Sequence, residues 1–139
     1  MHLSISKACL GLSFLFLALA PSLAAEKAYL CAINEVYECV DLTGCNRISL
    51  KTANLPAVML LDVEKKKFKS APLGQEPIAN DIENVTVTGE FVLLHGIGKN
   101  APTPRAFSAL VSMKTGKLSA GVSTPDASLA ITGECTAQP

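Results

Sequence analysis

Cysteine is the residue type with the clearest capacity for chemistry in this sequence. Apart from Cys9, which lies in an apolar N-terminal segment, the chain has four cysteines, at positions 31, 39, 45 and 135. An even number of thiols in an exported chain most simply forms two disulfides. A zinc or copper site would need thiolates and usually histidines at close spacing, and the sequence has no C-x-x-C pair. We therefore predict two disulfides, no metal site and no cofactor.

The spacing of the cysteines restricts how they can pair. Cys31 and Cys39 lie on a run that reads as one strand, which would separate them by roughly 26 Å, whereas a disulfide needs Cα atoms within about 7 Å. This excludes that pair and leaves two of the three pairings. We favour Cys31 with Cys135 and Cys39 with Cys45, because the first bond would join the opening strand to the closing strand.

His95 is the one histidine outside the N-terminal segment. A general base needs a nucleophile or a substrate proton within reach and an orienting carboxylate. The sequence has no G-x-S-x-G motif, and the cysteines beyond Cys9 are assigned to disulfides. We interpret His95 as a strand residue that hydrogen-bonds a backbone carbonyl, and we predict that the protein is not an enzyme.

An acidic cluster, Glu76, Asp81 and Glu83, contains residue types that serve glycoside hydrolysis or calcium binding. Its spacing matches no calcium loop, and we interpret it as a solvated acidic loop. The run Asn84, Val85, Thr86 fits the glycosylation sequon, a short pattern that arises often by chance.

The N-terminus has the composition of a secretory signal. Lys7 supplies positive charge, residues 10–20 form an apolar run too short to span a bilayer, and residues 22–24 place small side chains at a signal-peptidase site. We predict that residues 1–24 are removed, which leaves residues 25–139 as a single β domain with no membrane segment. The predicted location is the periplasm or the exterior of the cell.

The charge balance argues against a polyanionic partner. Loss of Lys7 with the signal would leave 11 basic side chains against 12 acidic ones among the remaining 115 residues. Phosphate-backbone binding would then lack its main electrostatic term, so we exclude nucleic acid as a partner.

Alternating apolar and polar residues predict strands. The run 105–113 has the period of two expected of a half-buried strand, with one parity formed by Phe107, Ala109, Val111 and Met113. A turn at residues 114–117, where Gly116 can adopt a positive φ, returns the chain as a second strand. Residues 127–135 form a third strand and place Cys135 on its packed face.

About eight short strands follow from counting such runs, at intervals of roughly 8 to 12 residues. The others are predicted at residues 27–40, 57–63, 68–71, 80–88 and 90–96. We expect an all-β fold, an antiparallel meander closed as a small barrel or sandwich, whose first and last strands become neighbours on closure. Residues 50–55 read as one helical turn that Ser49 or Thr52 caps and Pro56 ends.

Two long loops are the candidate contact surface, residues 72–81 and 96–104, because loops on a rigid scaffold often carry binding residues. The candidate residues in and beside them are Gln75, Glu76, Gly98, Lys99, Asn100 and Arg105. We expect a non-enzymatic binding protein whose partner is either an unknown protein or a small apolar ligand. A carrier of such a ligand would have an apolar cavity lined by Leu93, Phe107, Val111 and their neighbours.

Several short motifs resemble a group of small uncharacterised exported proteins of proteobacteria. They are Tyr29-Leu30-Cys31, Glu38-Cys39, Gly44-Cys45, Pro56, Arg105-Ala106-Phe107-Ser108, Thr115-Gly116-Lys117-Leu118-Ser119 and Gly133-Glu134-Cys135-Thr136. This resemblance implies export and a small β fold. Tyr29 and Cys31 also resemble the opening of the periplasmic lysozyme inhibitors, eight-stranded barrels with a bridge to the last strand. That likeness implies an inhibitor or accessory subunit of an exported enzyme, although the inhibitors' serine- and glycine-led loop is not found.

Overall fold

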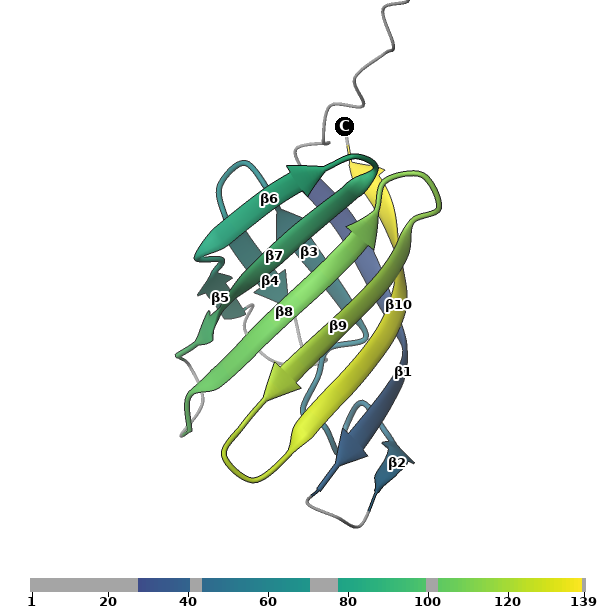
Figure 1. Ribbon diagram of the computed structural model, residues 1–139, viewed down its shortest axis with the longest axis vertical. Helices are drawn as coiled ribbons and strands as arrows, with labels where there is room; N and C mark the ends of the chain where they lie inside the picture. Colours follow the sequence, from purple (N-terminus) through teal and green to yellow (C-terminus); the bar gives the residue numbers. More distant parts are fainter. Residues whose placement is uncertain (1–27, 41–43, 71–77, 100–102, 139) are drawn as a thin grey trace, which may run out of the picture.

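The computed structural model describes residues 28–40, 44–70, 78–99 and 103–138. These residues form one antiparallel sheet of ten strands (Figure 1). The strands are β1 (Ala28–Cys39), β2 (Cys45–Ile48), β3 (Val58–Asp62), β4 (Lys67–Ser70), β5 (Ile78–Asp81), β6 (Asn84–Thr88), β7 (Phe91–Gly98), β8 (Arg105–Ser112), β9 (Lys117–Ser123) and β10 (Ser128–Gln138). Within the described part of the chain, no helix is long and apolar enough to cross a membrane.

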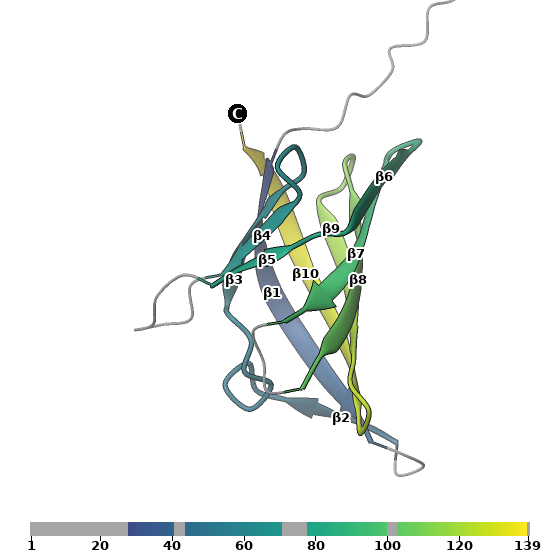
Figure 2. The same cartoon turned by 90° about the vertical axis from the view of Figure 1, so that its left-hand side faces the viewer.

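The strand order is β5-β4-β3-β1-β10-β9-β8-β7-β6, with β2 paired to β1 beside this path. Apart from β1, which lies between β3 and β10, strands that are neighbours in the path are neighbours in sequence. The sheet curls into a half-barrel, with β3, β4 and β5 on one side and β6, β7 and β8 on the other (Figure 2). The all-β antiparallel meander is therefore confirmed, including the pairing of first and last strands.

The sheet has ten strands instead of eight, because β2 was not predicted and because one predicted strand is two. The run predicted at residues 80–88 is divided at Ile82 and Glu83 into β5 and β6, which occupy opposite edges of the sheet. The Ile82 amide donates to the carbonyl of Lys66 at 2.9 Å, and the Glu83 amide donates to the carbonyl of His95 at 3.0 Å. These two hydrogen bonds tie the chain to both sides of the half-barrel as it crosses from one edge to the other.

Gly96 is the point where β7 approaches β5. A Cβ atom at this residue would lie 2.8 Å from the carbonyl oxygen of Asp81 and 2.7 Å from the ring of Phe107. Phe107 is the cross-strand partner of Gly96, and its ring centroid lies 6.1 Å from that of Phe68 on β4. The absence of a side chain at Gly96 thus permits the close approach, and the two rings pack from opposite sides of the half-barrel.

A bulge in β1 changes which residues face inward. The pairing with β10 shifts between Ile33 and Glu35, so that the inward parity passes from Ile33 to Val36. Read as one unbroken alternation, the sequence of this strand predicts Tyr37 and Cys39 on the packed face, with charged Glu35 as an exception. That interpretation is wrong beyond the bulge, because the extra residue reverses the alternation and leaves Glu35 on the outer face.

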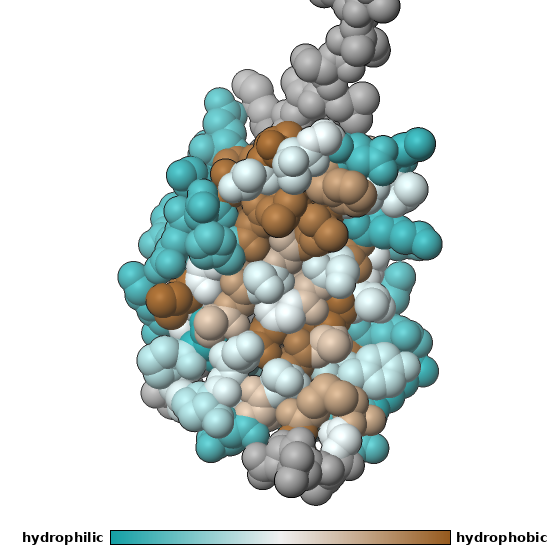
Figure 3. All heavy atoms as spheres, in the orientation of Figure 1, coloured by the Kyte–Doolittle hydropathy of each residue, from teal (hydrophilic) through white to brown (hydrophobic). Residues whose placement is uncertain are grey.

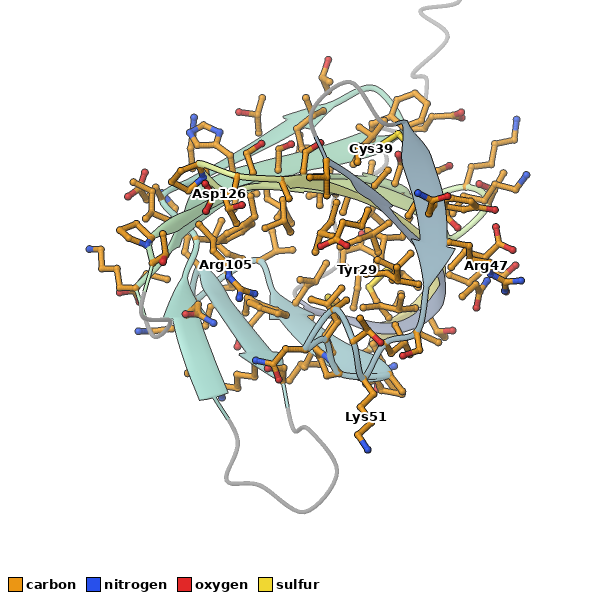
Figure 4. All side chains as sticks on the ribbon, turned by 90° about the horizontal axis from the view of Figure 1, so that it is seen from below. Tyr29, Cys39, Arg47, Lys51, Arg105 and Asp126 are labelled. Atoms are coloured by element: carbon orange, nitrogen blue, oxygen red, sulfur yellow. A yellow bond between two sulfur atoms is a disulfide. The ribbon has the colours of Figure 1, made fainter. Side chains whose placement is uncertain are left out.

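Two groups of buried side chains fill the interior. The upper group includes Cys31, Val92 and Val111, which are fully buried, and packs with Leu94 and Leu118. The lower group consists of Ile33, Val36, Ala53 and Ile131. Tyr29, at 3% exposure, belongs to the upper group and lies near the centre of the ring of strands in Figure 4.

Both favoured disulfides are present, Cys31–Cys135 and Cys39–Cys45. Each joins residues that are direct partners on antiparallel strands, β1 with β10 and β1 with β2. Two disulfides indicate that the chain folds in an oxidising compartment outside the cytoplasm.

Residues 49–55 form a hydrogen-bonded helical turn, as the sequence predicted. The Ser49 side chain accepts a hydrogen bond from the amide of Thr52 at 3.0 Å, the usual contact of a helix N-cap. Asn54 has a φ of 52°, and the Leu55 amide donates to the carbonyl of Leu50 at 2.9 Å, which together terminate the turn. Ala53 is buried by this arrangement against the lower group of side chains.

Candidate functional site

The inner face of the half-barrel is only partly filled. Along β8, Val111 is completely buried, whereas Ala109, Phe107 and Arg105, which follow it on the same face, are all half-buried. Burial falls in the same way along the neighbouring strand β9, from buried Leu118 to half-buried Ala120 and Val122. Inward-facing side chains that are still partly exposed indicate a hollow in the lower half of the interior.

That hollow is a cavity of about 190 Å³. Its apolar lining consists of Leu55, Pro56, Met59, Leu61, Phe68, Leu94, Phe107, Ala109, Leu118, Ala120, Val122 and Ile131. Its volume is comparable to a cavity of about 150 Å³ that binds benzene. Eight-stranded barrels can likewise enclose one small ligand.

Two short side chains lie side by side where the cavity begins on the inner face of the sheet. Ala109 and Ala120 are direct partners in the pairing of β8 with β9. The pair above them, Val111 with Leu118, fills the interior with branched side chains. The methyl groups of Ala109 and Ala120 reach less far into the interior than the side chains of Val111 and Leu118. Space therefore remains below the upper group of buried residues.

Polar groups gather where the cavity opens. Asn54 from the helical turn, Ser70 from β4, Asn80 from β5 and Arg105 from β8 all contribute to its lining. In Figure 4, viewed from below, the Arg105 side chain lies on the inner side of the ring of strands. Among the described lining residues, Arg105 is the only one with a charged side chain. The cavity therefore combines an apolar body with a cationic, hydrogen-bonding mouth.

The two predicted contact loops begin and end at this mouth. Ser70 precedes one of them, while Gly98 and Arg105 flank the other, and all three residues line the cavity. The predicted bounds were too wide, because residues 78–81 form β5 and residues 96–98 belong to β7. The bounds were wrong since both loops contain residues that pair with neighbouring strands.

Of the candidate contact residues, Lys99 is exposed immediately after β7. Gln75, Glu76 and Asn100 lie outside the described residues.

The predicted cavity lining was right for one residue of three. Phe107 lines the cavity. Val111 faces inward but belongs to the filled part of the core, with no exposed surface. Leu93 faces outward and is 41% exposed, and its neighbour Leu94 lines the cavity instead. Both parities of this strand are apolar, so alternation could not identify its inner face.

His95 is exposed on the outer face of β7, opposite Ser108. Asp81 and Glu83, two members of the acidic cluster, lie on either side of the crossing between β5 and β6, and Glu76 is outside the described residues. Asn84, the first residue of the sequon, is exposed on β6. No group of three or more metal-ligating side chains occurs within residues 28–40, 44–70, 78–99 and 103–138.

Asp81 forms an exposed ion pair on the outer surface, at the end of β5. Its carboxylate accepts a hydrogen bond from the Lys67 ammonium at 2.5 Å, between paired strands β4 and β5. This hydrogen bond, the positive charge of Lys67 and, more weakly, that of Lys99 lower the pKa of Asp81 below its ordinary value of 3.8. The carboxylate thereby stays ionised and is paired with a cation outside the cavity.

A shallow groove occurs beside β2, lined in part by Asn34, Glu35 and Arg47. The Arg47 and Glu35 side chains form an ion pair across it at 3.3 Å, and both are largely exposed. The groove thus has its charges already paired and little apolar lining.

The outer face of β7 and β8 carries exposed apolar side chains. Leu93 and Leu110 are cross-strand partners with about 40% exposure each, and Phe91 is exposed beside them on β7. Figure 3 shows hydrophobic residues gathered on the face that β6 to β9 present. This outer apolar face is separate from the cavity because its residues have the opposite parity.

No known family model, curated protein or solved structure matches this chain significantly.

Proposed function

We propose that this protein is an exported, non-enzymatic binding protein that holds one small apolar molecule in the cavity beside Ala109 and Ala120. The observation that carries the proposal is the half-burial of inward-facing apolar residues below Val111. A protein interior is ordinarily close-packed, and an apolar hollow loses contacts that a ligand can restore.

The surroundings of the cavity favour reversible binding by a stable scaffold. The Cys31–Cys135 bond fixes the opening and closing strands next to each other, directly above the hollow region. The mouth lies between strand ends that continue into the two candidate loops. Binding would then require no rearrangement of the paired strands, which lowers its entropic cost.

The expected site of action is the periplasm or the medium. Two disulfides and a signal-like N-terminus support this location. In that compartment a carrier or a sensor of small apolar compounds would meet its ligand outside the inner membrane.

The experiment is a titration of the oxidised protein with 1-hexanol, followed through the methyl NMR signals of labelled alanines. We expect saturable shifts at Ala109 and Ala120, with a dissociation constant on the order of 1 mM for so small a probe. Ala130, on the outer face of β10, serves as the internal reference and should not shift. Unmoved Ala109 and Ala120 signals up to the solubility limit of hexanol would reject the proposal.

A second candidate function is protein binding through the outer apolar face. Exposed apolar side chains on two adjacent strands, Leu93 with Leu110, favour it. The resemblance of Tyr29 and Cys31 to the opening of lysozyme inhibitors suggests an enzyme as the partner.

A lysozyme assay on bacterial cell walls tests this second candidate. It predicts inhibition by the wild-type protein and a loss of about tenfold or more in potency for Leu93→Glu, because a carboxylate would be buried in the contact. Leu30→Glu, at an equally exposed leucine on β1, far from β7 and β8 in the sheet, is the matched control for added charge. Absence of inhibition by the wild-type protein would remove the lysozyme-inhibitor function.

A further inference from the structure

Resting on the proposed function, we infer that the ligand is a small organic anion, a carboxylate with a short hydrocarbon body, whose charged group binds Arg105. The juxtaposition of one cationic side chain with an otherwise uncharged, mostly apolar cavity carries this inference.

The positive charge of the site determines which sign of charge the ligand carries. None of the described lining residues is acidic, and Asn54, Ser70 and Asn80 add amide or hydroxyl groups around the mouth. Asp81, the nearest described carboxylate on β5, has outward parity and is paired with Lys67. A guanidinium presents several N–H donors in a planar fork that matches a carboxylate. The mouth therefore favours an anion over a cation or a neutral molecule.

The half-burial of Arg105 strengthens this preference. A fully exposed guanidinium would be screened by water and salt, and its attraction for an anion would be slight. Arg105 is half-buried on the inward face of β8, two residues before Phe107. No ion pair of Arg105 with another described residue is found.

The dimensions of the cavity set the length of the hydrocarbon body. By comparison with the cavity that holds benzene, a volume of 190 Å³ accepts about eight non-hydrogen atoms. Arg105, Phe107 and Ala109 follow one another on one face at intervals of roughly 7 Å. An extended chain of six carbons is about as long as one such interval. A carboxylate bound at the Arg105 guanidinium thus places the chain beside Phe107 and directs it toward Ala109, where the apolar lining is continuous.

The test compares hexanoate with 1-hexanol, two probes of similar length that differ in charge at neutral pH. Both are titrated into the oxidised full-length β domain, residues 25–139, and followed through the alanine methyl signals. We expect hexanoate to bind about five- to tenfold more tightly than hexanol, the size of a charge-assisted hydrogen bond in a partly exposed setting.

Variants of Arg105 locate the source of this preference. Arg105→Gln should reduce the ratio of hexanoate affinity to hexanol affinity to about one. Arg105→Lys, which keeps the charge but loses the fork, should retain part of the preference. Lys117→Gln, at the opposite end of β9, removes the same charge far from the mouth and should leave the preference intact.

The outcomes separate the two proposals. Equal affinity for the two probes, or a preference that survives Arg105→Gln, overturns the anion inference while the binding function stands. Binding of neither probe overturns both. A loss of preference that Lys117→Gln reproduces would show a general effect of net charge and would also overturn the assignment to Arg105.

Discussion

Ala109 and Ala120 are direct partners across β8 and β9, and both line the same cavity. Their neighbours in the ladder, Val111 with Leu118 on one side and Phe107 with Val122 on the other, are all larger. One cross-strand pair of small residues therefore creates the hollow on which the proposed function depends.

Filling this hollow should abolish binding without unfolding the protein. In Ala120→Leu, three added carbons would occupy the cavity and bury apolar surface, so we expect unfolding free energy to stay constant or rise by up to about 2 kcal/mol. Hexanol should no longer shift the Ala109 signal. Thermal unfolding and the methyl titration measure the two effects.

The control for the filling variant is Ala130→Leu, which adds the same atoms to the outer face of β10. It should bind hexanol as the wild type does. If Ala120→Leu still bound the probe with wild-type affinity, the cavity would not be the binding site.

The close approach of β7 to β5 should depend on the absence of a side chain at Gly96. In Gly96→Ala the added Cβ would lie under 3 Å from the Asp81 carbonyl and the Phe107 ring, and the required shift should destabilise the protein by about 1 to 3 kcal/mol. In Gly98→Ala the nearest atom would be 3.7 Å away, so stability should stay within about 0.5 kcal/mol. Urea unfolding of both variants provides the comparison, and equal effects would contradict the described contact.

The two disulfides should contribute unequally. Cys31–Cys135 spans 104 residues and Cys39–Cys45 spans 6. In the chain-entropy model, these separations correspond to about 4.7 and about 2 kcal/mol. Guanidinium unfolding of a Cys31→Ala, Cys135→Ala variant and a Cys39→Ser, Cys45→Ser variant should therefore give a larger loss for the first pair. The reverse order would show that entropy of the unfolded chain does not govern the difference.

The Lys67–Asp81 ion pair should make a small, acid-sensitive contribution to stability. Because the folded-state pKa of Asp81 lies below 3.8, the contribution is fully present above the unfolded pKa and is lost as pH falls through the folded pKa. The difference in unfolding temperature between wild type and Asp81→Asn should shrink to zero from about pH 6 to about pH 2. Salt at about 1 M should also reduce this difference in unfolding temperature. A difference that is independent of pH would contradict the assignment to Asp81.

Much of the architecture follows from local patterns. The alternation ending in Cys135 and the alternation beginning at Tyr29 placed both cysteines on packed faces, and short reversals made the first and last strands neighbours. The pairing of Ala109 with Ala120 could also have been derived, because the turn at Gly116 fixes the register of its hairpin. The missing step was to compare side-chain sizes across that register.

Other features depend on contacts that local sequence does not specify. The division at Ile82 and Glu83 occurs in a run without proline or glycine. It arises from hydrogen bonds to Lys66, in the turn before β4, and to His95 on β7. The bulge in β1 had one signal, the charged Glu35 at an inward position of the alternation. The sequence has no signal that identifies the inner face of β7, because Leu93 and Leu94 are equally apolar.

The central claim is that the protein carries a small ligand in its cavity. Native mass spectrometry of wild type and Ala120→Leu, both isolated from the protein's own host without refolding, tests it most directly. We predict an added mass of about 100 to 150 Da on the wild type, released on unfolding and absent from the filled variant. Identical bare-chain masses for the two proteins, or the same added mass on both, would contradict the account.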